Sequence, residues 1–185
     1  MTKATTTVIG LGDNDAQFNV YIGNRPAFDF KTSDDNKVHP VSKGEIYACG
    51  QACGNGWRKV FNVYAKLVFA CASEHLGTND YKCWQDYRDH KLLQLHSGTS
   101  LMFTPPSFTA PTSPTPPAVH LIMGRTYANS LNLPHDLTWL DNEFAINHEH
   151  QIIVCPYFDY RQLSNIKIIR LVDLISELQS NKAPS

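Results

Sequence analysis

A short apolar run that ends in a turn decides the fold: Phe18-Asn19-Val20-Tyr21-Ile22-Gly23-Asn24-Arg25-Pro26. Its first five residues are typical of a buried strand, and the strand ends at the glycine because a proline cannot occupy a central strand. Three further runs of this kind cover residues 100–104, 119–123 and 151–155. Each is followed by a proline or glycine, so the chain is predicted to contain four buried strands.

Helical patterns lie between these strands. The apolar residues of segment 57–71 recur at helical spacing, and a second helical stretch covers about 81–95. A helical turn is expected at 125–132, and a closing helix after Ser164-Asn165. Continuous apolar strands that alternate with helices predict an α/β fold, with a mostly parallel, four-stranded central sheet in a three-layer sandwich.

The length of 185 residues predicts a single domain over 1–185. Six of the eleven prolines fall within 105–117, which we interpret as a surface loop of that domain. No apolar run is long enough to cross a bilayer, and residues 1–7 lack the apolar core of a secretory signal. We therefore expect a cytoplasmic protein without a membrane partner.

The charges are nearly balanced, with 16 basic and 17 acidic residues. A net charge of -1 gives no overall attraction to nucleic acid or to an anionic membrane. Any nucleic-acid binding should therefore involve few phosphate contacts and depend weakly on salt. The composition leaves the oligomeric state open.

The five cysteines form no C-x2-C pair and are predicted to be reduced thiols. Cys49 and Cys53 could approach His39 or His75, but their spacing does not fit the common zinc modules. The sequence His148-Glu149-His150 is expected to be a polar turn rather than a metal pair. We predict no metal and no cofactor.

The functional crevice of a parallel sheet lies beyond the carboxyl ends of its strands. The candidate loops therefore begin at Gly23, Thr104, Gly124 and Cys155. The loop from Cys155 to Asn165 contains three aromatic residues, an Asp and an Arg. Such a loop either folds down as a lid or stacks on a flat ligand, because a base stacked on an aromatic ring gains about 1–3 kcal/mol.

The order of these strand ends, Val20–Ala27, Leu101–Thr104, Val119–Gly124 and Cys155-Pro156, resembles the uracil-DNA glycosylase superfamily. In that superfamily four parallel strands each end in a short motif around a base-binding pocket. The first motif, Gly-Gln-Asp-Pro-Tyr, has its Gly and Pro in step with Gly23 and Pro26 here. The resemblance implies a glycosylase-like fold with a pocket for a nucleobase.

The polar residues of the motifs differ from those of the superfamily. Asn24 replaces the Gln, Arg25 replaces the Asp that activates water in many members, and Thr104 replaces a base-reading Asn. Cys155-Pro156 stands where the superfamily has His-Pro-Ser-Pro. An arginine cannot accept a proton from water, so orthodox glycosylase activity is not expected unless Asp159 supplies the carboxylate.

The resemblance and the loop composition together predict a set of site residues. Asn24 and Thr104 would hydrogen-bond a planar ligand, and Arg25 would contact its phosphate or carboxylate. The predicted stacking and polar residues of the fourth loop are Tyr157, Tyr160 and Arg161, with Asp159 as the candidate catalytic carboxylate. In the alternative interpretation Phe158 belongs to the core, Asp159 and Arg161 form a surface ion pair, and the tyrosines fill the crevice.

Glycines that lead into a helix at 50–59 suggest another site, in which Arg58 and Lys59 bind an anion. The favoured interpretation is that Gly54 and Gly56 break a helix and let Trp57 reach the core.

The first functional hypothesis is a domain that binds a nucleobase, a nucleotide or a nucleic-acid end. The alternative is a non-enzymatic interaction or assembly protein that docks a partner through the proline-rich loop and exposed aromatics. A third is a small-molecule hydrolase that uses Asp159 and a strand-end histidine that the sequence does not identify. If the protein is an enzyme, we expect a hydrolase that acts on an N-glycosidic or related bond.

Overall fold

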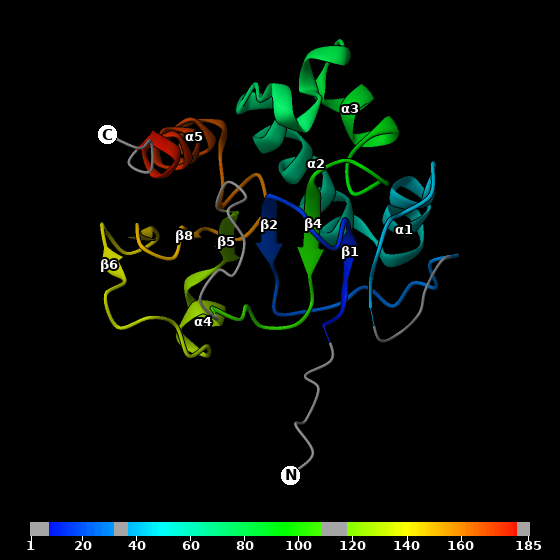
Figure 1. Ribbon diagram of the computed structural model, residues 1–185. Coiled ribbons are helices and arrows are strands. Elements are labelled where there is room, and N and C mark those ends of the chain that lie inside the picture. The colour runs from blue at the N-terminus through cyan, green and yellow to red at the C-terminus, as the bar shows by residue number, and fades with distance from the viewer. Residues whose placement is uncertain (1–7, 32–36, 109–117, 181–185) are drawn as a thin grey trace.

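The computed structural model describes residues 8–31, 37–108 and 118–180, and these form one mixed sheet with helices on both faces (Figure 1). The eight strands that it describes lie in the order β3-β1-β4-β2-β5-β8-β7-β6. The strands are β1 (Gly10–Gly12), β2 (Phe18–Tyr21), β3 (Val38–His39), β4 (Thr99–Met102), β5 (Val119–Met123), β6 (Thr138–Trp139), β7 (Ala145–Asn147) and β8 (Ile152–Cys155). The α-helices are α1 (Glu45–Cys53), α2 (Asn55–Ala70), α3 (Trp84–His90), α4 (Arg125–Asn129) and α5 (Asn165–Ser180), and single 3-10 turns cover Glu74–Leu76 and Thr78–Asp80.

The four predicted strands are β2, β4, β5 and β8, and they lie side by side in the middle of the sheet. Each is parallel to its neighbour among these four, and Val20 lies opposite both Leu101 and Leu121. The prediction of an α/β fold around parallel strands is therefore confirmed.

The prediction of only four strands is wrong. β1 pairs antiparallel with β4, β7 pairs antiparallel with β8, and β3 and β6 lie at the two edges. These four additional strands have two or three residues each, which is too short to show a period-2 pattern. Their pairing depends on neighbours that are distant in the sequence.

The two faces of the sheet carry separate cores. Val20 and Leu121 point into the larger core, which they share with α1, α2, α3 and α5. Tyr21 and Ile122 point to the opposite face, where Ala128 of α4 packs against them. The parallel strands are therefore covered on both sides, by a thick helical layer and by a thinner one (Figure 1).

The helix α2 supplies the central contact of the thick layer. Trp57, Phe61 and Tyr64 are buried on one side of it, as the predicted stripe requires. The Tyr64 hydroxyl, fully buried, donates a hydrogen bond to the carbonyl oxygen of Ser100 at 2.7 Å and so ties the helix to β4.

Two other helices differ from the prediction. The chain between 45 and 53 forms α1, and Gly54 adopts a φ of 89° between α1 and α2. The stretch predicted as helix over 81–95 contains α3, which ends at His90, and Leu93 adopts a positive φ of 59°. A residue in this left-handed region interrupts a helix, so the apolar pattern of 81–95 continues beyond the helix itself.

The connections of the parallel strands define where a site can form. The chain leaves β2 toward β4 on one side and leaves β5 toward β8 on the other side. In open α/β sheets, ligands bind at such a switch point, outside the carboxyl ends of the strands. Here the switch point lies between the ends of β2 and β5.

Two further predictions concern the surface. Residues 105–108 of the proline-rich segment have neither helix nor strand, and the rest of that segment lies outside the described residues. None of the helices in the described ranges combines the length and the apolar character needed to cross a bilayer.

Candidate functional site

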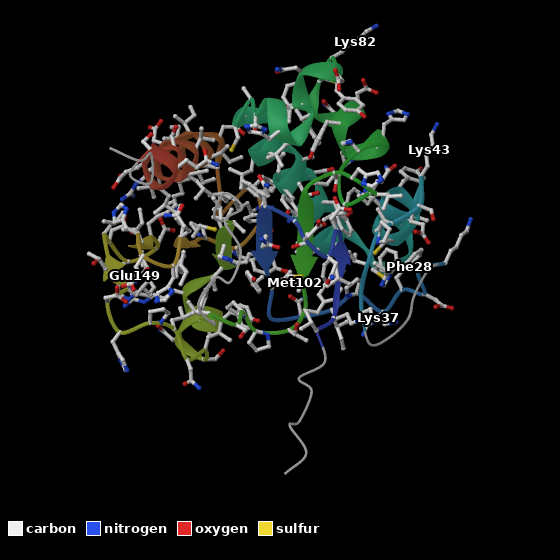
Figure 2. All side chains as sticks on the ribbon, in the orientation of Figure 1. Phe28, Lys37, Lys43, Lys82, Met102 and Glu149 are labelled. Atoms are coloured by element: carbon white, nitrogen blue, oxygen red, sulfur yellow. The ribbon has the colours of Figure 1, made fainter. Side chains whose placement is uncertain are left out.

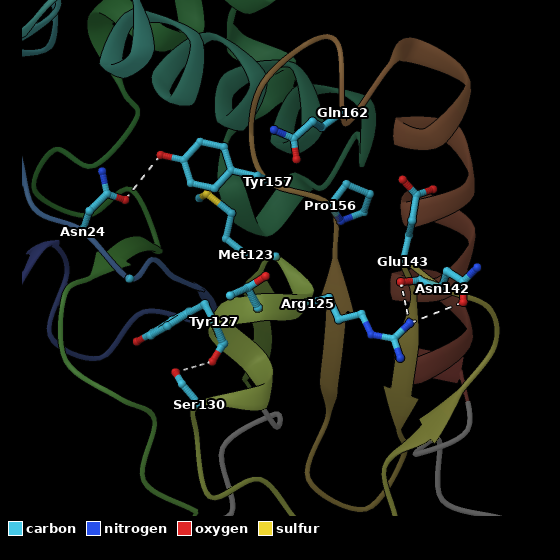
Figure 3. A pocket seen from close by; sticks show the side chains of 13 residues that line it. Asn24, Met123, Arg125, Tyr127, Ser130, Asn142, Glu143, Pro156, Tyr157 and Gln162 are labelled. Carbon is cyan, nitrogen blue, oxygen red and sulfur yellow. Dashed lines mark hydrogen bonds between the residues drawn. The ribbon is translucent and has the colours of Figure 1, made fainter.

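A cleft of about 580 Å³ opens at the switch point (Figure 3). Its walls come from the carboxyl ends of β2, β5 and β8, from α4 and from the connection between β6 and β7. We call it the strand-end cleft, and it is lined by Gly23, Asn24, Met123, Gly124, Arg125, Thr126, Tyr127, Ser130, Asn142, Glu143, Pro156, Tyr157 and Gln162.

Two tyrosines form the aromatic part of the strand-end cleft. The hydroxyl of Tyr157 donates a hydrogen bond to Oδ1 of Asn24 at 3.3 Å, which joins the loops after β8 and β2 (Figure 3). Tyr127 lies so close to Gly23 that a Cβ there would be 3.0 Å from its ring. Burial raises the pKa of both tyrosines, so their hydroxyls keep their protons at neutral pH.

Arg125 and Glu143 form the charged part of the strand-end cleft. Nη1 of Arg125 donates to the carbonyl oxygen of Asn142 at 3.1 Å, and its guanidinium lies 4.5 Å from the ring centroid of Trp139. Glu143 forms an ion pair with Lys167 at 2.7 Å. The contacts of Arg125 hold its guanidinium in one orientation in the lining of the cleft. The Lys167 ammonium balances the negative charge of the Glu143 carboxylate.

This arrangement suits the binding of a flat, polar ligand. The rings of Tyr127 and Tyr157 offer stacking surfaces, and the amide of Asn24 carries both a donor and an acceptor group. Met123 contributes an apolar part of the lining. A few polar groups around an apolar lining are the usual composition of a small-molecule site.

The structure brings together two of the predicted site residues, Asn24 and Tyr157, in the strand-end cleft. Arg25 lies instead beside β4, with its guanidinium 5.8 Å from the ring centroid of Phe103. Oγ1 of Thr104 accepts a hydrogen bond from the backbone N–H of Ile9 at 3.3 Å. Neither Arg25 nor Thr104 lines the strand-end cleft.

Asp159 also lies outside the lining of the strand-end cleft. Its carboxylate accepts the backbone N–H of Arg161 at 2.9 Å and pairs with Nζ of Lys59 at 3.0 Å. These contacts, chiefly the N–H of Arg161, lower the pKa of Asp159. The carboxylate is therefore a weak base, and three of the predicted site residues, Arg25, Thr104 and Asp159, do not line the strand-end cleft.

The aromatic residues of the fourth loop have different environments. Phe158 is fully buried in the core, as the alternative interpretation of this loop expects. Tyr160 is 53% exposed, and its ring centroid lies 4.8 Å from Nζ of Lys59 and 5.9 Å from the guanidinium carbon of Arg161. Tyr160 and Arg161 therefore lie with Lys59 and outside the lining of the strand-end cleft.

The proposed anion site at Arg58 and Lys59 is not formed as a convergent pair. Lys59 points to Asp159, whereas Arg58 lines a separate pocket between α1 and α2. Gly54 breaks the chain into two helices, and Trp57 is buried against Phe61 and near Phe103. The favoured interpretation of a helix break that brings Trp57 to the core is therefore confirmed for Gly54, whereas Gly56 lies within α2.

Sequence reasoning missed Arg125, Tyr127, Asn142 and Glu143. The loop that begins at Gly124 was among the four predicted loops, and the position of Arg125 and Tyr127 just after a buried strand was a usable signal. Asn142 and Glu143 come from the connection between β6 and β7, which folds back beside the parallel strands. Nothing in the local sequence indicates that return.

The cysteines and histidines considered as metal ligands have other surroundings. Burial raises the pKa of Cys49 to about 12, with a contribution from Cys53, so its thiol keeps its proton. His39 is buried near the ring of Phe30, and His148–His150 form the turn between β7 and β8. Within residues 8–31, 37–108 and 118–180, no group of three His, Cys, Asp or Glu side chains could hold a metal ion.

Fold and cleft together define the protein as a mixed α/β domain with a ligand-sized cleft at the carboxyl ends of its parallel strands. Residues 9–176 match a family of unknown function, DUF6942. Because this match covers most of the chain, the protein belongs to that family. Neither the curated proteins nor the solved structures give a significant match.

Proposed function

We propose that the strand-end cleft binds a planar polar ligand of the nucleobase, nucleoside or nucleotide class, without orthodox glycosylase activity. The observation that carries the proposal is the position of Tyr127, Tyr157 and Asn24 in one cleft at the switch point of the sheet. These residues come from three different strand ends, so only the folded protein assembles them. A nucleobase fits this chemistry because it combines a flat face with donors and acceptors at its edge.

The resemblance to the uracil-DNA glycosylase superfamily supports the same ligand class. The four strands that carry the resemblance are adjacent and parallel, and the residues after the first, third and fourth of them line the strand-end cleft. Asn24, in place of the superfamily's Gln, keeps an amide at the end of the first strand. We therefore propose that this protein recognises a nucleobase, as the superfamily does, but does not hydrolyse its glycosidic bond by the superfamily's mechanism.

The environment of the carboxylates near the strand ends supports the part of the proposal that excludes orthodox hydrolysis. Asp159 has a lowered pKa and is held by Lys59 and the backbone of Arg161. Glu143 lines the strand-end cleft but is paired with Lys167. Activation of a water needs a carboxylate that is placed to accept a proton beside the ligand, and Asp159 does not line the strand-end cleft.

The test is calorimetric titration with uracil, adenine, their nucleosides and their monophosphates. One member of this panel should bind saturably to the wild type. Tyr157→Ala should weaken its binding by about fivefold to 150-fold, because a stacked ring contributes about 1–3 kcal/mol. Tyr157→Phe, which keeps the ring and loses the hydroxyl, should be affected less.

Tyr160→Ala is the matched control. It removes a tyrosine from the same loop, and its side chain is 53% exposed and outside the lining of the strand-end cleft. The control should bind as the wild type does. Equal binding by Tyr157→Ala and the wild type, or no saturable binding by any member of the panel, would contradict the proposal.

A further inference from the structure

A second pocket lies between α1 and α2 and shares no residue with the strand-end cleft. It has a volume of about 210 Å³. Polar side chains of Gln51, Asn62, Arg58 and Arg88 line it, and Phe61 contributes an apolar wall. Two guanidinium groups thus face one small pocket, which we call the arginine pocket.

Arg88 is fixed before any ligand arrives. Nε of Arg88 donates to Oδ1 of Asp89 at 2.8 Å, and Nη2 donates to Oδ2 at 3.1 Å. Its Nη1 donates to Oδ1 of Asn62 at 2.6 Å, and the guanidinium carbon lies 5.5 Å from the ring centroid of Trp84. Asp89 balances the charge of Arg88, and the four contacts hold the Arg88 guanidinium in one position in the lining of the pocket.

Arg58 carries the unbalanced charge of the arginine pocket. Its aliphatic stem passes Gly50, where a Cβ would lie 3.5 Å from Cβ of Arg58. Its guanidinium has no ion-pair partner in the part of the chain that the structure describes. A free guanidinium beside amide donors matches a carboxylate, with which arginine forms two parallel hydrogen bonds.

A neighbouring pocket extends the same surface. It has a volume of about 280 Å³ and shares Ile46 and Tyr47 with the arginine pocket. Its charged lining residues include Lys43 and Asp89, and the Asp89 carboxylate is already paired with Arg88. The Lys43 side chain points away from the body of the protein (Figure 2) and forms no ion pair with any residue in the described ranges. Tyr47 is 65% exposed and lines both pockets.

The sizes of the two pockets point to side chains as ligands. Both volumes lie below the range of about 300–1,000 Å³ that is usual for sites of small organic ligands. In an extended segment, alternate side chains point the same way, so residues two apart can enter neighbouring pockets. An exposed Tyr beside two Arg also has the composition of interface hot spots.

We propose that this surface docks an extended acidic segment of a partner protein. A Glu or Asp side chain of that segment enters the arginine pocket and pairs with Arg58. A second side chain, two residues away, enters the pocket beside Lys43, and the segment packs over Tyr47 between them. This inference does not depend on the ligand of the strand-end cleft.

The experiment is a selection of short random peptides displayed on phage against the purified full-length chain. The same library is selected against Arg58→Gln, Tyr47→Ala and Lys59→Gln. Lys59→Gln is the matched control, because it removes one positive charge from the next residue of α2, whose side chain points to Asp159. Circular dichroism melting curves establish that the variants are folded.

The wild type and Lys59→Gln should both select peptides enriched in Glu and Asp at positions two apart or flanking an apolar residue. A selected peptide, synthesised and titrated, should bind Arg58→Gln at least about tenfold more weakly, because a hydrogen-bonded charge pair is lost. Its affinity should also fall with added salt. The proposal is overturned if no peptide is enriched, if the enriched peptides lack acidic residues, or if Arg58→Gln binds them as the wild type does.

Discussion

His120 should make the stability of the protein depend on pH between 6.5 and 4. It lies in β5 on the face opposite α2, where its Nδ1 is 2.9 Å from the hydroxyl of Tyr21. The ring of Phe108 lies against it, with a centroid distance of 5.7 Å. Burial, with a smaller contribution from His150, lowers the pKa of His120 from 6.5 to about 4.

The direction of the effect follows from proton binding. Between pH 6.5 and pH 4 the unfolded chain binds a proton at this residue and the folded protein does not. The contribution of neutral His120 to the free energy of unfolding is therefore complete above pH 6.5, and it is lost as the pH falls toward 4. Each tenfold difference in proton affinity corresponds to about 1.36 kcal/mol, so the loss reaches about 3 kcal/mol as an upper limit.

Urea unfolding at several pH values measures this loss. The wild type and His120→Gln are compared, because glutamine cannot titrate but can still bond to the hydroxyl of Tyr21. The free energy of unfolding of the wild type should fall more steeply below pH 6.5, and the extra fall should approach about 3 kcal/mol near pH 4. Parallel pH dependences for the two proteins would refute the assignment of a buried neutral histidine.

Three further predictions concern packing at Gly23, the buried carboxylate of Glu45 and the candidate carboxylate of Asp159. Gly23→Ala should weaken ligand binding and lower the free energy of unfolding, measured in urea, by about 1–3 kcal/mol, because the new Cβ would lie 3.0 Å from the ring of Tyr127. The control is Gly56→Ala, whose Cβ would meet no described atom within 4 Å and which should not destabilise the protein. Glu45→Ala should lower the free energy of unfolding by about 1–3 kcal/mol for each lost hydrogen bond, because the buried carboxylate accepts the N–H groups of Lys31 and Ser42, both at 2.6 Å. Wild-type stability of this variant in urea would contradict the prediction. Asp159→Asn should lower the free energy of unfolding by at most about 1 kcal/mol, because Asp159 and its partner Lys59 are both partly exposed. The variant should bind nucleosides as the wild type does. A loss of binding would place Asp159 in the functional site.

Strong, continuous apolar patterns were sufficient to predict the centre of the fold. The runs that became β2, β4, β5 and β8 have no polar interruption long enough to suggest a loop, and α2 and α5 show clear helical stripes. Burial on both faces imposes this pattern locally, so the sequence carries it. Helices also lie between β2 and β4 and between β5 and β8, as a parallel arrangement of these pairs requires.

The edges of the sheet and α1 could not be predicted in the same way. β3 and β6 have two residues each, and their pairing depends on strands far along the chain. The N-cap residue of α1 is Gly44, which makes no side-chain cap hydrogen bond, and the Glu45 carboxylate bonds to the N–H of Ser42 just before the helix. Neither the short strands nor the start of α1 has an apolar stripe by which the sequence could reveal it.

The candidate site was predictable in position but only partly in composition. The rule that sites lie beyond the carboxyl ends of strands led to the loops that form the cleft, and Asn24 and Tyr157 line it. The sequence cannot show which way a side chain turns at a loop, and Arg25 turns toward Phe103 instead. The cytoplasmic location stays a prediction.

The central claim is that the strand-end cleft binds a planar polar ligand, and an NMR titration tests it most directly. The ¹⁵N-labelled protein is titrated with uridine monophosphate and adenosine monophosphate while the backbone amides are followed. The account predicts saturable shifts centred on Asn24, Gly124, Tyr127 and Tyr157, with little change at Gly56 or Ser176. Shifts that centre on another surface would contradict it, as would the absence of shifts with both nucleotides and with the nucleobases and nucleosides of the calorimetric panel.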